Sequence, residues 1–212
     1  MKHIPLLVVL GFALSLCNLT NRFKQSTTNS NSSNTNSSGS TASESSDTVV
    51  EPGKPTDAQL AAIAGGHEAK WQRQGMIFTV PANWTEQGNE AKEFLWSAPG
   101  SKASLIVSIS PMDENFATDA SINAFYQGAK TRAKNGEVDE LKWIEIDGLK
   151  GVQFRESNPE KPDDHRRLQW LAYRKFAGQI QFVNVMLAST GENFPVNQDA
   201  MYGILYSMKI TH

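Results

Sequence analysis

Cysteine is almost absent from this 212-residue chain, whose single copy is Cys17. One cysteine cannot form an intramolecular disulfide in any compartment. Since Cys17 precedes the whole segment that we expect to fold, thiol catalysis is excluded for that segment. Histidine is scarce too, with four copies, and apart from the final residue only His67 and His165 lie within or beside the segment that we expect to fold.

The sequence also lacks an excess of charge of either sign. Its 20 Lys and Arg residues nearly balance 22 Asp and Glu residues, which gives a net charge of −2 and a pI near 6.1. A phosphate-binding surface requires clustered Lys and Arg, whereas here acidic and basic residues are interspersed. We therefore expect no nucleic-acid partner.

The apolar run at the amino terminus is too short to span a membrane, because a spanning helix needs roughly 20 apolar residues. It extends from Ile4 to Leu16, is interrupted by Pro5, Gly11 and Ser15, and follows the basic Lys2. A basic residue followed by a short apolar core is typical of a secretory signal. An uncleaved amino-terminal anchor is the alternative.

Cys17 directly follows this apolar core. The segment Leu14-Ser15-Leu16-Cys17 resembles a bacterial lipobox, in which the cysteine is lipidated and becomes the first mature residue. Leu16 departs from the lipobox pattern, because a small residue is usual at the position directly before the cysteine. Ordinary cleavage after Ser15 is the rival, but it would leave an unpaired thiol near the mature terminus. We predict a signal over 1–17 and lipidation at Cys17, with several acyl chains, enough for a stable anchor.

A polar segment separates Cys17 from the foldable part of the chain. Ser, Asn and Thr make up nearly all of residues 25–46. Such a composition buries too little apolar area to offset the entropy lost on ordering. We predict a disordered tether over 18–50, with a mean span on the order of 30 Å. A neutral low-complexity insert is the alternative interpretation.

The rest of the chain predicts one α+β domain over 70–212, preceded by a short helix and linker over 51–69. All five tryptophans lie beyond residue 70. Alternation of Leu105, Val107 and Ile109 with serines is the period-two signature of a strand with one buried face. Together the patterns predict an antiparallel sheet flanked by helices. The predicted strands are 76–80, 93–96, 104–109, 141–146, 152–154, 168–176 and 180–187, with helices over 119–134 and from Pro195 to about 205.

Several short motifs of this domain resemble the PsbP-like and DcrB-like domains, over about residues 70–211. These motifs are Phe78-Thr79-Val80-Pro81 with Trp84 and Trp96 after it, Phe125-Tyr126, Ile146-Asp147-Gly148 with Gly151, an aromatic hairpin, and Ser207-Met208-Lys209-Ile210. The resemblance implies an α/β/α sandwich, an antiparallel sheet between helices. It further implies an envelope protein that binds or stabilises a partner, without a catalytic apparatus.

The sequence predicts no catalytic residue, no metal site and no cofactor. It has no Gly-x-Ser-x-Gly nucleophile elbow and no phosphate-binding glycine loop. His165 follows Asp163 and Asp164, but adjacent residues converge poorly on one ion, and the arginines after it would repel a cation. We expect a solvated loop there and an exposed linker position for His67. Acid–base pairs are conceivable among Asp113, Glu114 and Asp119, or between Asp139 and Glu140, but no spacing favours them.

Trp143 is the only residue that we single out for binding. If Ile144 and Ile146 face the core, alternation turns Trp143 to the opposite face, beside Glu145. A helix covering that face is the alternative, and would make Trp143 part of a core. Trp is enriched at the centres of protein interfaces.

These patterns favour an envelope lipoprotein, held outside the cytoplasm, whose tethered non-catalytic domain binds a protein partner. A carrier of a small apolar ligand or lipid is the alternative, and would require a closed apolar cavity. A hydrolase acting on a cell-wall polymer is third, and would require carboxylates clustered in a cleft.

Overall fold

The computed structural model describes residues 49–211. The predicted signal, Cys17 and the tether up to residue 48 lie outside these residues, so those assignments stay predictions. Within the described range, no helix has both the length and the apolar character needed to cross a membrane.

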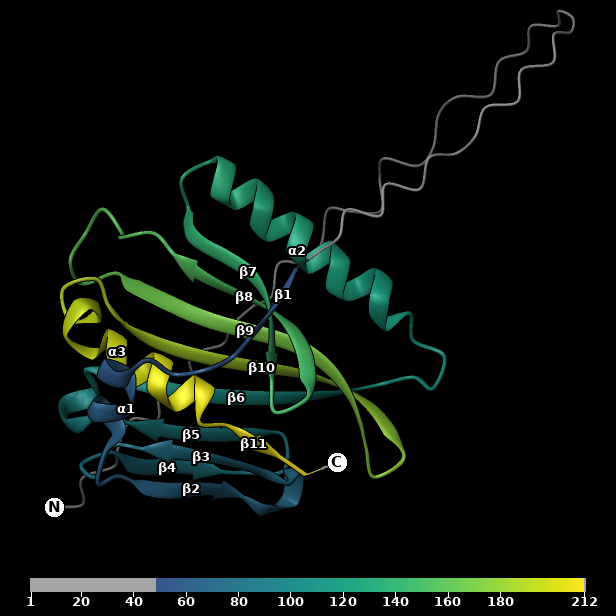
Figure 1. Cartoon of the computed structure of the whole chain (residues 1–212), viewed down its shortest axis with the longest axis horizontal. Helices are drawn as coiled ribbons and strands as arrows, with labels where there is room; N and C mark the ends of the chain where they lie inside the picture. Colours follow the sequence, from purple (N-terminus) through teal and green to yellow (C-terminus); the bar gives the residue numbers. More distant parts are fainter. Residues whose placement is uncertain (1–48, 212) are drawn as a thin grey trace, which may run out of the picture. The chain divides into compact units, whose positions relative to one another are not determined.

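The described chain forms a large sheet and a small one, with three α-helices (Figure 1). The large sheet has eight strands in the order β1-β7-β8-β9-β10-β6-β5-β4, and the small sheet has the order β11-β3-β2. The large-sheet strands are β1 (Val50–Pro52), β4 (Thr85–Asn89), β5 (Glu93–Ser97), β6 (Ala103–Met112), β7 (Val138–Ile146), β8 (Leu149–Glu156), β9 (His165–Phe176) and β10 (Gln179–Thr190). The small-sheet strands are β2 (His67–Trp71), β3 (Met76–Val80) and β11 (Lys209–Ile210), and the helices are α1 (Asp57–Ile63), α2 (Thr118–Lys134) and α3 (Phe194–Tyr206).

Strand pairing is antiparallel throughout the described sheets except between β1 and β7, which run parallel. Two tight turns set the register of the main hairpins. Asp147-Gly148 joins β7 to β8 and Ala177-Gly178 joins β9 to β10, with positive φ at all four residues. Positive φ at both central positions is the condition for a type I′ turn, which matches the twist of the paired strands. The predicted α+β class and mostly antiparallel sheet are confirmed.

Helix α3 and the small sheet cover one face of the large sheet, and helix α2 covers the other. The larger core lies on the face packed by α3 and β3 and includes Trp71, Leu105, Trp170 and Val185. A smaller core, with Trp143 and Phe154, lies under α2 on the other face. Strand β6 shows the division directly, since Leu105, Val107 and Ile109 are buried while the alternate residues are only half-buried.

The segment before residue 70, expected as a helix and linker over 51–69 after a tether that ends at Val50, packs as part of the domain from Val50 onward. Strand β1 pairs with β7, with Val50 opposite Trp143. Helix α1 begins with a capping box between Thr56 and Gln59 and packs closely on α3, where a Cβ at Gly203 would lie 2.6 Å from the Gln59 carbonyl oxygen. His67 is exposed as expected but belongs to β2 rather than to a linker. A boundary at residue 70 therefore falls inside a paired strand.

Candidate functional site beside helix α2

Helix α2 lies across β7, β8 and β9 and covers the face on which Trp143 stands (Figure 1). The Tyr126 ring stacks on the Trp143 ring with centroids 5.2 Å apart, and Ala129 is buried against the sheet. The helix therefore uses residues spaced three apart as its contact surface.

Trp143 points away from the core face of Ile144 and Ile146, as strand alternation predicts. Its side chain is only 5% exposed, because α2 covers it. The Lys150 ammonium lies 4.7 Å from the centroid of the indole ring. Trp143 is therefore a buried packing residue with one edge facing a pocket, and its role in binding stays a prediction.

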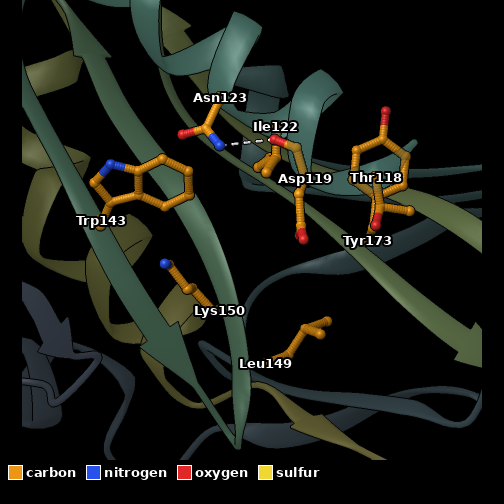
Figure 2. A pocket seen from close by; sticks show the side chains of 8 residues that line it. All are labelled: Thr118, Asp119, Ile122, Asn123, Trp143, Leu149, Lys150 and Tyr173. Carbon is orange, nitrogen blue, oxygen red and sulfur yellow. Dashed lines mark hydrogen bonds between the residues drawn. The ribbon is translucent and has the colours of Figure 1, made fainter. Parts of the chain in front are cut away.

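The pocket beside Trp143 has a volume of about 420 Å³. Figure 2 shows Trp143 and Tyr173 on opposite sides, Lys150 below the indole, and the first turns of α2 along a third side. The Asn123 side-chain nitrogen donates to the Asp119 carbonyl oxygen at 2.8 Å, which fixes Asn123 along the helix. Lys150 and Asp119 place opposite charges at the pocket, and Ile122 and Leu149 supply its apolar lining.

A row of four aromatic rings extends from this pocket along α2. We call it the aromatic row: Phe116, Tyr173, Phe182 and Phe125. Neighbouring ring centroids along it lie 5.5, 5.1 and 5.2 Å apart. The two end rings are among the exposed large apolar side chains of the described residues, with Phe116 at 36% and Phe125 at 40%. A hydrogen bond of 2.8 Å between the Tyr173 and Ser121 hydroxyls ties the row to α2.

Sequence reasoning missed the aromatic row, because its members are scattered over more than 60 positions. One signal was available for its central pair. The turn at Ala177-Gly178 places Phe176 opposite Gln179, and counting outward places Tyr173 opposite Phe182. The positions of Phe116 and Phe125 depend on how α2 packs, which strand register does not specify.

Beyond the aromatic row, the same face of the sheet continues over β10, β6 and β5. Met186, Ile106 and Leu95 stand side by side there and are each half-buried. Next to them, Gln169 donates to the Asn184 side-chain oxygen at 2.7 Å. This part of the face is thus partly apolar, with its polar side chains bonded to one another.

Two of the carboxylates considered as acid–base candidates, Asp139 and Glu140, are bonded to neighbouring side chains. Asp139 accepts hydrogen bonds from Arg155 at 2.7 Å and from Arg166 at 2.5 Å. Glu140 accepts one from the Tyr202 hydroxyl at 2.5 Å. Asp113, Glu114 and Asp119 are exposed. The arrangement of Asp139 and Glu140 is that of a bonded polar network rather than of an acid facing a base.

The segment around His165 differs from the solvated loop that we expected. His165 is exposed, but Arg166 beside it is buried, with its guanidinium 4.3 Å from the Phe194 ring centroid. The Arg166 Nε donates to the Glu156 carbonyl oxygen at 2.7 Å. Between residues 49 and 211, no group of three or more His, Cys, Asp and Glu side chains is placed to hold a metal ion.

Glu156 joins two further arginines to this network. Burial alone would raise the pKa of its carboxyl, but hydrogen bonds from Arg167 and Arg132 outweigh burial and hold the pKa below its ordinary value. The network therefore stabilises the edge where β8 and β9 meet the end of α2.

Comparison with known proteins identifies the fold. No family model matches the sequence, and no curated protein matches it. LpqN, involved in cell envelope biogenesis of Mycobacterium tuberculosis, aligns with a TM-score of 0.50 at 11% identity, over 70% of this chain and 86% of that one. Cyanobacterial PsbP from Synechocystis aligns with a TM-score of 0.45 at 11% identity, over 68% and 92%. The domain therefore shares the fold of LpqN.

Two further solved structures show weaker likeness. The Ran-binding protein Mog1p of Saccharomyces cerevisiae aligns with a TM-score of 0.39 at 10% identity, over 69% of this chain and 95% of that one. A Bacteroides thetaiotaomicron protein aligns with a TM-score of 0.43 at 10% identity over 65% of this chain, and the match spans only 46% of that protein. At 11% identity the likeness to LpqN concerns the fold alone.

Proposed function

We propose that this chain is an envelope lipoprotein whose tethered, non-catalytic domain binds a protein partner through the aromatic row and the pocket beside Trp143. The aromatic row is the observation that carries the proposal. Two exposed phenylalanines and two half-buried rings form one continuous surface. Aromatic side chains are enriched at the centres of protein interfaces.

The chemistry of this surface defines the partner segment that it fits. The aromatic row offers apolar area to a large aliphatic or aromatic side chain of the partner. The pocket that Tyr173 of the row helps to line carries Lys150 and Asp119, which suit a polar group flanked by opposite charges. We propose an extended or helical protein segment with one apolar anchor and adjacent charged residues.

The envelope location rests on the amino-terminal sequence: an export signal, Cys17 for lipidation, and a polar tether before the domain. LpqN, which shares the fold, is described as involved in cell envelope biogenesis. This fold is thus compatible with an envelope role.

The two other candidate functions receive less support. The four pockets described between residues 49 and 211 are all lined by polar side chains, alone or mixed with apolar ones, which does not favour an apolar ligand. A hydrolase would need free carboxylates facing each other. Asp139 and Glu140 instead bind arginine, lysine, glutamine and tyrosine side chains.

Site-specific photo-cross-linking in cells that produce the protein tests this proposal. A photoreactive residue is placed at Phe125 and, as a matched control, at Val196, an 85% exposed apolar residue on α3. We expect one discrete protein adduct from position 125, none of the same mass from position 196, and loss of the adduct on Tyr173→Ala. Equal adduct patterns at both positions, or no adduct at position 125, would overturn the proposal.

A further inference from the structure

A second pocket lies where three segments meet on the opposite side of β7. Its walls are the chain from Glu51 to Gln59, the strands β7 and β8, and helix α3, and its volume is about 340 Å³. Figure 1 shows the chain from β1 to α1 running alongside α3. We call this pocket the polar chamber, and its key side chains are Glu51, Glu140, Lys142, Arg155, Gln198 and Tyr202.

Glu140 is the centre of the chamber and is bonded on both carboxylate oxygens. One oxygen accepts from the Gln153 side-chain amide at 2.7 Å and lies 3.2 Å from the Lys142 ammonium. The other accepts from the Tyr202 hydroxyl at 2.5 Å. Gln153 is fully buried and in turn accepts from the Tyr206 hydroxyl at 2.9 Å. The carboxylate is therefore fixed in orientation, as a pre-organised site requires.

The tyrosines of this network are neutral hydrogen-bonding groups at physiological pH. Burial, followed by the hydrogen bond to Glu140, raises the pKa of Tyr202 above its ordinary value. Burial also raises the pKa of Tyr206. Their rings lie on one wall, one helical turn apart on α3, with centroids separated by 5.7 Å.

Other groups of the chamber keep hydrogen-bonding capacity. The Arg155 Nε is occupied by Asp139 at 2.7 Å, whereas its Nη1 lies 3.5 Å from a Glu140 oxygen and reaches Tyr202 and Gln198 only at 3.3 and 3.5 Å. Hydrogen bonds of that length are weak. The Glu51 carboxylate lies 3.7 Å from the Lys142 ammonium, beyond hydrogen-bond distance. Arg155, Gln198 and Glu51 can thus donate to, or accept from, a ligand in the chamber.

The mixture of these groups selects a class of ligand. Three cationic residues, Lys54, Lys142 and Arg155, face two anionic ones, Glu51 and Glu140, so the charges nearly cancel. A hydroxyl group both donates and accepts, and thus matches walls that carry both donors and acceptors. The volume is at the low end of ligand pockets, which span roughly 300–1,000 Å³. We propose that the polar chamber binds a small hydroxyl-rich molecule, one sugar or polyol ring.

This proposal is independent of protein binding through the aromatic row, because the two pockets share no lining residue. It is tested on the full chain by calorimetry and saturation-transfer NMR with three probes: glucose, N-acetylglucosamine and myo-inositol. Sodium phosphate and glycine serve as ionic controls. We expect at least one hydroxyl-rich probe to bind with a Kd on the order of 1 mM or tighter, and the two ions to bind more weakly.

Variants then assign the binding to the chamber. Gln198→Ala and Glu51→Ala should each weaken it by roughly 3- to 10-fold, the effect of losing one hydrogen-bonding group. Gln127→Ala, on the exposed side of α2, is the matched control and should leave it unchanged. Binding of none of the three probes, binding of phosphate or glycine only, or equal weakening by Gln127→Ala would overturn the proposal. The adduct at position 125 should persist in Gln198→Ala, so failure of one proposal is distinguishable from failure of the other.

Discussion

Replacing Gly151 by alanine should destabilise the domain strongly. Gly151 lies in β8 between Ile144 of β7 and Ala172 of β9, in the middle of the large sheet. A Cβ at this position would lie 2.5 Å from the Leu171 carbonyl oxygen and 2.6 Å from the Trp170 indole. Both neighbours are held, one as sheet backbone and the other as a fully buried ring.

The magnitude follows from what would have to move. Adding a methyl group to a well-packed core costs about 1–3 kcal/mol when side chains can shift. Here a backbone oxygen and the largest type of side chain must both shift, so we expect a loss of about 3 kcal/mol, at the upper end. For a domain of this size, that corresponds to a fall in Tm of roughly 6–12 °C.

Gly128→Ala is the matched control for the same chemical change. Gly128 lies on the exposed side of α2, and a Cβ there would meet nothing within 4 Å. Because glycine is a poor helix former, this variant should be stabilised by about 1 kcal/mol. Urea unfolding of the full chain, followed by tryptophan fluorescence, measures both variants. A Gly151→Ala variant within about 0.5 kcal/mol of wild type, or a Gly128→Ala variant equally destabilised, would refute the reasoning.

Three other outcomes are expected. Trp143→Ala should lower the free energy of unfolding by about 3–5 kcal/mol. Trp143→Phe should lower it by clearly less, because a ring still packs on Tyr126. Urea titrations measure both variants, and similar losses would contradict this packing. The folded pKa of Glu156 is depressed, so its stabilising effect is present above its unfolded pKa of about 4.5 and is lost as the pH falls through the folded value. Glu156→Gln should therefore lower the free energy of unfolding by about 2 kcal/mol at neutral pH and by progressively less in acid. The exposed Glu114→Gln is the control and should change it little at any pH. Mass spectrometry of the mature protein should find acyl chains on Cys17 and none in Cys17→Ser. The Cys17→Ser protein should also be lost from the membrane fraction. A mature chain that begins at Leu16 would instead show ordinary cleavage.

Much of the fold was predictable because its signals are local. The alternation of Leu105, Val107 and Ile109 identified β6. The predicted strands 141–146 and 152–154 fall within β7 and β8. The same alternation placed Trp143 on the face opposite Ile144. These signals need only neighbouring residues, since side chains in a strand alternate and a tight turn constrains its own φ angles.

The amino-terminal part of the domain was less predictable. Strand β1 has only three residues. Strand β2 has two buried residues, Ala69 between charged neighbours and Trp71 at its end. Neither pattern distinguishes a strand from a linker. Strand β1 exists because the distant β7 offers its backbone edge, and β2 because it pairs with β3, the next strand along the chain.

For the two candidate sites, too, some features follow from the local sequence and others only from contacts between distant segments. The sequence by itself determined that Trp143 faces away from the main core, since strand alternation depends only on adjacent positions. Only the tertiary structure decided that α2 buries this ring, that Phe116, Tyr173, Phe182 and Phe125 meet in one row, and that Glu140 meets Tyr202 from α3. The physical reason is that helix packing and strand order bring together residues more than 60 positions apart, and no local periodicity records which of them will touch.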